Sequence, residues 1–264
     1  MDRQLLILST LCYLVATVRA ALVLRAGTFK PGRFNFLMVA FGFVLQTGFL
    51  TLRGHALGHC PLTNLFEVFV FLAWSVALIY LVVGPVYQLS LMGAFTAPVV
   101  LIIQAFALLA PIDVPSAARV RANPWLEFHA SVSLIAYGAF ALAFVAGVMY
   151  LVQERQLKTH QLRSIFYQLP PLTDLFAAIT RLLWLGFALY TVGLASGFLT
   201  GQPLPRLKVI CAFVVWILYG AILQGRHLRR LAPRHVAALC IIAFTAAVSV
   251  LWAINFATQK LPVQ

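Results

Sequence analysis

Acidic side chains are scarce in this 264-residue sequence, in which aspartate and glutamate together number six. They form no close pairs for acid–base catalysis, and a proton-driven transporter would have few carboxylates for a proton relay. A Ser-His-Asp order, a phosphate-binding glycine loop and a zinc-protease helix motif are also missing. These absences favour a non-enzymatic role, and the question of an enzymatic activity stays open.

Cysteine is also rare, and its four copies stand far apart in the chain. Because no Cys-x-x-Cys pair occurs, a disulfide framework, a thiol redox motif and a Cys-x-x-Cys-His site for covalent haem attachment are all absent. Cys12, Cys211 and Cys240 lie within apolar runs, where small buried residues are typical. Cys60 stands in a polar stretch beside His59, and a single cysteine there is a poor basis for a metal site.

Charged residues make up only 9% of the chain, whereas hydrophobic residues make up 62%. Soluble domains of this length do not normally have this composition. Apolar runs of roughly 20 residues recur, and at about 1.5 Å per residue each is long enough to cross a bilayer. The sequence therefore predicts an all-α, polytopic membrane helix bundle that forms a single integral membrane domain over residues 1–264. About eight transmembrane helices are expected, over Leu5–Leu24, Phe34–Leu52, Leu65–Val83, Val86–Ala110, Leu126–Val152, Leu175–Leu199, Lys208–Leu223 and Val236–Phe256, with a tight hairpin at Gly84-Pro85.

The cations that give the net charge of +13 lie in short segments between the apolar runs. There they are typical of topology determinants and of contacts with lipid headgroups. No basic helix or RNA-binding signature accompanies them, so no nucleic-acid partner is expected. With eight spans, 12 Lys and Arg residues fall on one side of the membrane and 7 on the other. The positive-inside rule places the richer side in the cytoplasm, so both termini are expected on the non-cytoplasmic face of a bacterial inner membrane.

The fifth predicted span begins with the first candidate site. Trp125 suits the lipid–water boundary, and His129, Ser133 and Tyr137 recur every four residues along one helical stripe on the non-cytoplasmic side. A titratable imidazole at the mouth of a membrane helix, with hydroxyls on the same face, points to a functional site. An interface histidine that is hydrogen-bonded to a neighbouring group is the open alternative.

Two further histidines precede the third span and lie on the same predicted face as His129. His55 and His59 belong to the polar segment RGHALGHCPLT (53–63). Imidazole nitrogens ligate metals and haem iron, so these residues are candidate second ligands. The alternative is that both are ordinary solvent-exposed loop histidines.

The start of the third predicted span carries a carboxylate. Asn64, Glu67, Phe71 and Trp74 recur at spacings of three, four and three on one helical face. A carboxylate one turn into a membrane helix is costly, so Glu67 is expected to face the bundle interior and to have a partner there. The alternative is an N-terminal acid favoured by the helix dipole, with Thr63 as the N-cap.

Three segments together resemble the cytochrome c assembly superfamily of membrane proteins. They are PLTNLFEVFVFLAW (61–74), GAFTAPVVLIIQAFALLAP (93–111) and PWLEFHASVSLIAYGAF (124–140). The pattern Pro-x-x-Asn-x-x-Glu, which begins at Pro61, and the pattern Trp-Leu-x-x-His-x-Ser, which begins at Trp125, are specific in combination. The resemblance is strongest over residues 55–256 and is nearest to the eight-span HemX-like or YpjD-like branch, related to the haem-handling subunit CcsA.

The resemblance implies that haem is handled on the outer membrane face, with an external histidine as axial ligand. His129 is the residue that matches this histidine, and the implied cofactor is haem b. Pro61, Asn64, Glu67 and Trp74 would then shape the neighbouring inner face, together with Trp125, Ser133 and Tyr137. The sequence departs from the haem-handling members in two places, because GFLTGQPLPRLK (197–208) lacks their Trp-Asp segment and Gln224 stands where they have a histidine.

Three functions are compatible with these features of the sequence. The first is a haem-binding or cytochrome c assembly protein in which His129 and either His59 or His55 hold iron six-coordinate, which suits carriage rather than catalysis. The second is a non-haem accessory scaffold subunit of a membrane complex, which the missing Trp-Asp segment favours. The third is a transporter of a small molecule such as haem. The expected partners are membrane lipid, haem and subunits of cytochrome c maturation or another membrane complex.

Overall fold

The computed structural model describes residues 2–26, 33–86, 92–109, 113, 123–159, 171–201, 206–228 and 230–260. Within these ranges the protein is all-helical, and each of the eight α-helices is long and apolar enough to cross a membrane. The prediction of an eight-span, all-α bundle is therefore confirmed. The helices are α1 (Asp2–Ala26), α2 (Phe34–Leu57), α3 (Leu65–Val86), α4 (Met92–Leu109), α5 (Pro124–Lys158), α6 (Leu172–Gly197), α7 (Arg206–His227) and α8 (Pro233–Lys260), and a 3₁₀ turn over Phe198–Thr200 follows α6.

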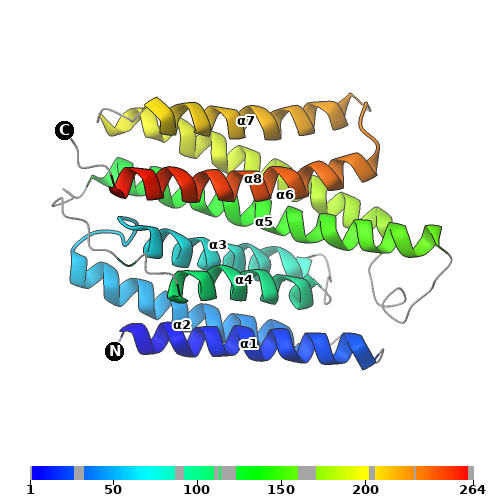
Figure 1. Ribbon diagram of the computed structural model, residues 1–264, viewed down its shortest axis with the longest axis horizontal. Coiled ribbons are helices and arrows are strands. Elements are labelled where there is room, and N and C mark those ends of the chain that lie inside the picture. The colour runs from blue at the N-terminus through cyan, green and yellow to red at the C-terminus, as the bar shows by residue number, and fades with distance from the viewer. Residues whose placement is uncertain are drawn as a thin grey trace.

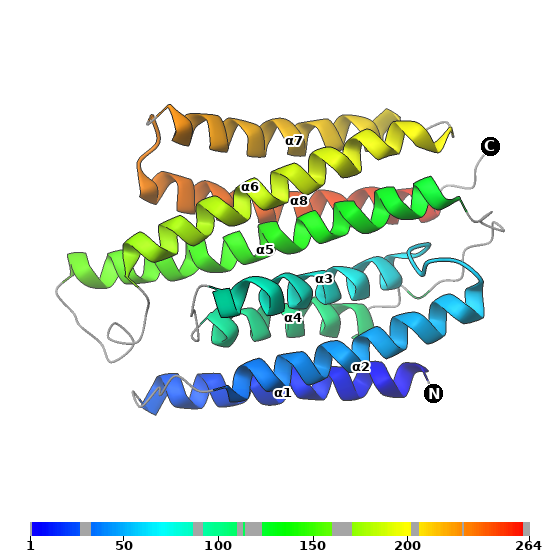
Figure 2. The same cartoon turned by 180° about the vertical axis from the view of Figure 1, so that it is seen from behind.

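The helices run roughly along one common direction, with both chain termini at the same end of the bundle (Figure 1). Helix α5 is central: it packs against α3 on one side and against α6 and α8 on the other. Helices α1 and α2 form one flank together with α4, and α7 lies on the opposite flank against α6 and α8. The reverse view shows the same order, with α3 and α4 between α5 and the α1–α2 pair (Figure 2).

Helix α5 is longer than the predicted span. It begins with Pro124 in its first turn, where the Asn123 side chain accepts a hydrogen bond from the backbone N–H of Trp125, and it continues to Lys158. At about 1.5 Å per residue, its 35 residues measure roughly 52 Å, whereas a bilayer core is roughly 30 Å thick. The helix therefore extends beyond the hydrocarbon, at the end where Lys158 binds Glu154 one turn earlier.

The prediction of a tight hairpin at Gly84-Pro85 is wrong. Helix α3 continues through both residues to Val86, α4 begins only at Met92, and the connection over 87–91 lies outside the described residues. Proline disfavours a helical conformation in the residue before it, partly through a clash with that residue's Cβ atom. Gly84 has no Cβ atom, so the helix passes this point at a low steric cost.

Buried polar side chains join the helices of the N-terminal half. The Tyr13 hydroxyl lies 2.9 Å from Gln46 Oε1, and Gln46 Nε2 donates to the Val70 carbonyl oxygen at 2.9 Å. Gln104 Nε2 lies 2.9 Å from Thr10 Oγ1 on α1. In an apolar environment such interhelical hydrogen bonds favour one specific packing. This half of the bundle therefore holds α3 in place, and α3 contributes Val68 to the lining of the cavity described next.

Candidate functional site

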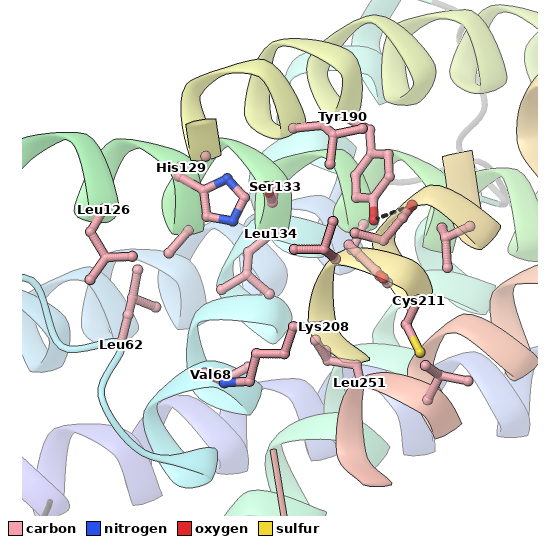
Figure 3. Close-up of a pocket in the computed structure, with 18 of the residues that line it drawn as sticks. Leu62, Val68, Leu126, His129, Ser133, Leu134, Tyr190, Lys208, Cys211 and Leu251 are labelled. Atoms are coloured by element: carbon pink, nitrogen blue, oxygen red, sulfur yellow. Dashed lines mark hydrogen bonds between the residues drawn. The ribbon is translucent and has the colours of Figure 1, made fainter. Parts of the chain in front are cut away.

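A cavity of about 380 Å³ lies at the end of the bundle where the chain begins and ends. Its walls come from α5, α6, α7 and α8, with Leu62 and Val68 from the start of α3 and the segment before it (Figure 3). Most lining side chains are apolar. The polar exceptions are His129, Ser133, Tyr137, Tyr190, Lys208 and Cys211. A cavity of this kind accepts an apolar body and offers it a few oriented polar contacts.

His129 projects from α5 into this cavity and is fixed by α6. Its Nδ1 atom lies 2.6 Å from the carbonyl oxygen of Gly193. A carbonyl oxygen only accepts, so Nδ1 carries the hydrogen, and in the neutral imidazole Nε2 keeps its lone pair. Metal-ligating histidines characteristically have this arrangement, in which one ring N–H is held by a carbonyl oxygen and the other nitrogen is free to bind metal. The same hydrogen bond joins α5 to α6, so His129 also has the contact that we expected of a histidine with only an interface role.

Two glycines of α6 allow this close approach. A Cβ atom added to Gly197 would lie 3.0 Å from His129 Nδ1, and one added to Gly193 would lie 2.5 Å from Ser133 Oγ. Side chains at these two positions would therefore push α6 away from the candidate site. The glycines form a Gly-x-x-x-Gly pattern, which is common where membrane helices approach closely. This signal is readable in the sequence and was missed by our sequence analysis.

The predicted stripe of His129, Ser133 and Tyr137 lines the cavity as a unit. The Tyr137 ring packs edge-on against Tyr190 of α6, with ring centroids 5.8 Å apart. The Tyr190 hydroxyl in turn donates to the carbonyl oxygen of Ala212 on α7 at 3.3 Å, as the dashed line in Figure 3 shows. Three helices thus place polar groups around one apolar space.

Lys208 contributes the positive charge of the cavity wall. It lies in the first turn of α7, and among the lining residues, all of which are described, no other arginine or lysine and no carboxylate occurs. A lysine at the end of an apolar membrane span usually extends toward the headgroups. The structure instead places Lys208 along the cavity, and in Figure 3 its side chain extends from α7 across the space toward α3.

His55 and His59 do not line the cavity. His55 is exposed in the last turn of α2, and His59 Nδ1 lies 3.0 Å from the Cys60 carbonyl oxygen. The structure therefore does not bring the three predicted histidines together around the cavity. Across the described ranges, no group of three or more His, Cys, Asp or Glu side chains could hold a metal ion.

Cys60 has the properties of a neutral thiol. Its Sγ atom lies 3.9 Å from the Ser131 hydroxyl, and burial raises the pKa of the thiol above its usual value. A thiol must lose its proton to act as a nucleophile or as a metal ligand. This position therefore does not favour a thiolate ligand.

Glu67 faces the interior and has a partner, as predicted. It is 1% exposed, and its Oε1 atom lies 2.8 Å from Arg53 Nε. Its Oε2 atom accepts from the Thr63 backbone N–H and from the Thr63 hydroxyl, both at 2.8 Å. The alternative with Thr63 as the N-cap is not met, because Asn64 caps α3 through a 2.8 Å bond from the Glu67 N–H to its Oδ1 atom. Pro61 is buried beside Gly54, just before this cap.

Asp113 extends this ion pair into a network. Its Oδ1 atom lies 2.7 Å from Arg53 Nη2 and 3.3 Å from Asn64 Nδ2, and its Oδ2 atom lies 2.7 Å from Arg3 Nη2. Burial alone would raise the pKa of Asp113, but the hydrogen bonds from Arg3 and Arg53 outweigh it and hold that pKa below its ordinary value. The network joins α1, α2 and α3 to the segment that precedes α5. Sequence reasoning counted these arginines only as topology determinants.

Trp74 and Trp125, which we predicted to shape the candidate site, do not line the cavity. Trp74 Nε1 donates to Thr47 Oγ1 at 2.8 Å, and the indole stacks on Phe43, so Trp74 joins α3 to α2. Trp125 is 50% exposed at the start of α5, beside Phe128. Its position fits a residue at the lipid–water boundary.

Comparison with known proteins identifies the family. The model of the family described as "Cytochrome C assembly protein" matches residues 62–261. The chain belongs to this family. The cytochrome c assembly match includes Asn64, Glu67, His129 and Lys208 and begins after His59.

Several relatives share most of their length with this member of the cytochrome c assembly family. Cytochrome c biogenesis protein CcsA of Synechococcus sp. (strain CC9902) is 28% identical over 248 residues, which cover 81% of this chain and 80% of the relative. Protein HemX of Brevibacillus brevis is 25% identical over 207 residues, with 75% of each chain covered. CcsA of Porphyra purpurea is 25% identical, with 74% of this chain and 75% of the relative covered.

Proposed function

We propose that this protein acts in cytochrome c assembly as a multi-pass protein of the bacterial inner membrane, and that it holds haem in the cavity beside His129. The family match and the names of its relatives support the assembly role. The candidate site supports the haem, which would be bound without a covalent link because the sequence has no Cys-x-x-Cys-His motif.

The hydrogen bond between His129 and Gly193 is the observation that carries this proposal. It orients the imidazole and, in the neutral ring, leaves Nε2 as a free donor at an apolar cavity. Imidazole nitrogen is a common axial ligand of haem iron, and a porphyrin needs apolar walls around most of its surface. The residues present therefore fit the group.

The proposal assigns His129 alone as the iron ligand from this chain. We expected His59 or His55 as a second ligand, and neither residue lines the cavity. A single protein ligand suits a protein that receives haem and passes it on, because fewer bonds must break on transfer. No reaction at the iron needs to be assigned to this chain.

A visible spectrum of the detergent-purified protein, expressed with ample haem, tests this proposal. We expect a haem b absorption band that His129→Ala loses. His55→Ala is the matched control, because it removes an exposed histidine from the same end of the bundle, and it should keep the band. An unchanged band in His129→Ala would remove this residue from the role.

A non-haem scaffold subunit remains the second candidate function. The absence of a Trp-Asp segment over 197–208 favours it. In that case the pure protein would be colourless and would co-purify in a fixed ratio with another membrane subunit. A haem band that depends on His129 would contradict this alternative.

A further inference from the structure

We propose that Lys208 binds an ionised carboxylate of the ligand in the cavity, and so selects an amphiphile that carries a carboxylate over its neutral ester. This inference rests on the proposed function, because the ligand considered is haem, which carries two propionate groups on an apolar ring. It adds a determinant of specificity on the wall opposite the His129 helix.

The first step is the electrostatic setting of Lys208. The first turn of α7 contains Arg206 and Lys208 and no acidic residue. The N-terminal end of a helix is itself electropositive, so two cations there are unfavourable until an anion is present. Anionic groups bind readily at such positions.

The second step is that no carboxylate among the described residues pairs with Lys208. The ion pairs of the described residues use the carboxylates of Glu67, Asp113 and Glu154, and their partners are Arg3, Arg53, Lys158 and Arg234. Lys208 takes part in none of these pairs. Lys208 is exposed at the rim of the cavity, and no described carboxylate neutralises it, so its ammonium group is available to an anionic group of a ligand in the cavity.

The third step is the arrangement of the two polar ends of the cavity. His129 enters from α5 and Lys208 from α7, with apolar side chains such as Leu62, Leu134 and Val209 among the other residues of the wall. A ligand that fills this space would place an apolar body against those side chains. Its electron-pair acceptor would face the imidazole and its carboxylate would face the ammonium group. Haem has this distribution of groups.

The test compares a diacid with its diester in the absence of iron. Metal-free protoporphyrin and its dimethyl ester are titrated into the full-length detergent-purified protein, and dissociation constants are read from porphyrin fluorescence. Wild type should bind the diacid roughly 10- to 100-fold more tightly than the ester, as expected for one charge-assisted hydrogen bond. Lys208→Met should abolish this ratio, and Lys208→Arg should keep it.

Arg206→Gln is the matched control. It removes one positive charge from the same helical turn, at a residue that does not line the cavity, and the ratio should persist. The haem spectrum of Lys208→Met serves as the folding control, because its band still depends on His129. A preference for the diacid that survives in Lys208→Met would overturn the assignment of Lys208.

The remaining outcomes separate this inference from the proposed function. A wild type that shows the His129-dependent haem band but binds diacid and ester equally would overturn only the role of Lys208. A wild type that binds neither haem nor porphyrin would overturn both. Native mass spectrometry tests whether Lys208 instead binds the phosphate of a membrane lipid. If an anionic phospholipid is bound to the wild type and lost in Lys208→Met, while the diacid-to-ester ratio is unchanged, Lys208 binds a lipid phosphate. That outcome would contradict the proposal that it binds a ligand carboxylate.

Discussion

The Nδ1 atom of His129 lies 2.6 Å from the carbonyl oxygen of Gly193, so the orientation of the candidate haem ligand is set by the neighbouring helix and not by α5 alone. Because Ser133 also meets α6 at Gly193, a change in helix spacing would move the imidazole and the hydroxyl together. The position of the free Nε2 atom therefore depends on how closely α6 packs against α5.

Gly193→Ala should disturb the site without removing any of its polar side chains. The new methyl group would lie 2.5 Å from Ser133 Oγ, so either the serine must rotate or α6 must move outward. Overpacking of this kind costs about 1–3 kcal/mol. We expect a lower melting temperature and a shifted or weakened haem band.

Gly48→Ala is the matched control for this substitution. Its methyl group would meet only Leu5 at 3.6 Å, which is an ordinary contact. It should therefore keep the haem band and gain stability from the better helix propensity of alanine. Equal effects of the two substitutions would contradict the close packing of α5 and α6.

Removal of Arg53 should destabilise the protein more than simultaneous removal of Arg53 and its partner. Arg53→Met leaves the Glu67 carboxylate buried without its cation, which we expect to cost about 3 kcal/mol. In Arg53→Met/Glu67→Gln the uncompensated charge is gone, and part of that loss should return. Thermal unfolding of the four proteins of this double-mutant cycle gives the coupling free energy. A double variant as unstable as the sum of the two single variants would show that the residues act independently.

The ion pairs of Asp113 should make stability depend on pH in the acid range. Its pKa is lower in the folded protein than in the unfolded chain, where an ordinary value of about 3.9 applies. The stabilisation is therefore complete above about pH 5 and is lost as the pH falls below 4 through the folded-state pKa. Melting temperatures are measured between pH 3 and pH 7. The melting temperature of the wild type should decrease as the pH is lowered from about 5 to 3, and the decrease should be smaller in Asp113→Asn.

A substitution of Arg3 distinguishes the contributions of the two ion pairs that Asp113 forms, one with Arg3 and one with Arg53. The Arg3 side chain is 69% exposed, whereas the Arg53 side chain is 18% exposed. Exposed ion pairs contribute little, so Arg3→Gln should change the stability at neutral pH by well under about 1 kcal/mol. An acid transition that disappears in Arg3→Gln would mean that the exposed pair is the important one.

Local patterns in the sequence predicted the number of spans, the stripe of His129, Ser133 and Tyr137, and the buried position of Glu67. Each of these depends on hydropathy or helical periodicity within a single helix, which the sequence displays directly. The partners of these residues come from distant parts of the chain. Arg53 meets Asp113 across 60 positions and His129 meets Gly193 across 64, so these pairs depend on the packing of whole helices.

The placement of Lys208 was missed for a related reason. A lysine at the end of a short apolar span is usually assigned to the headgroup region. Its direction depends on which side of α7 faces α6 and α8, and the weak amphipathicity of an apolar membrane helix does not reveal that face. The same limit applies to His55 and His59, whose shared side of the membrane was predicted without any evidence on their distance from His129.

The orientation of the bundle can be tested independently of haem. The distribution of 12 and 7 cations predicts that the C-terminus and His129 lie on the non-cytoplasmic side, and that the segment 160–170 lies in the cytoplasm. Alkaline phosphatase is active only outside the cytoplasm, so a fusion at the C-terminus should be active and a fusion within 160–170 should be inactive. Green fluorescent protein fused at the same two positions should give the opposite pattern. An active phosphatase within 160–170 would place His129 in the cytosol and would contradict the expectation that haem is handled on the outer membrane face.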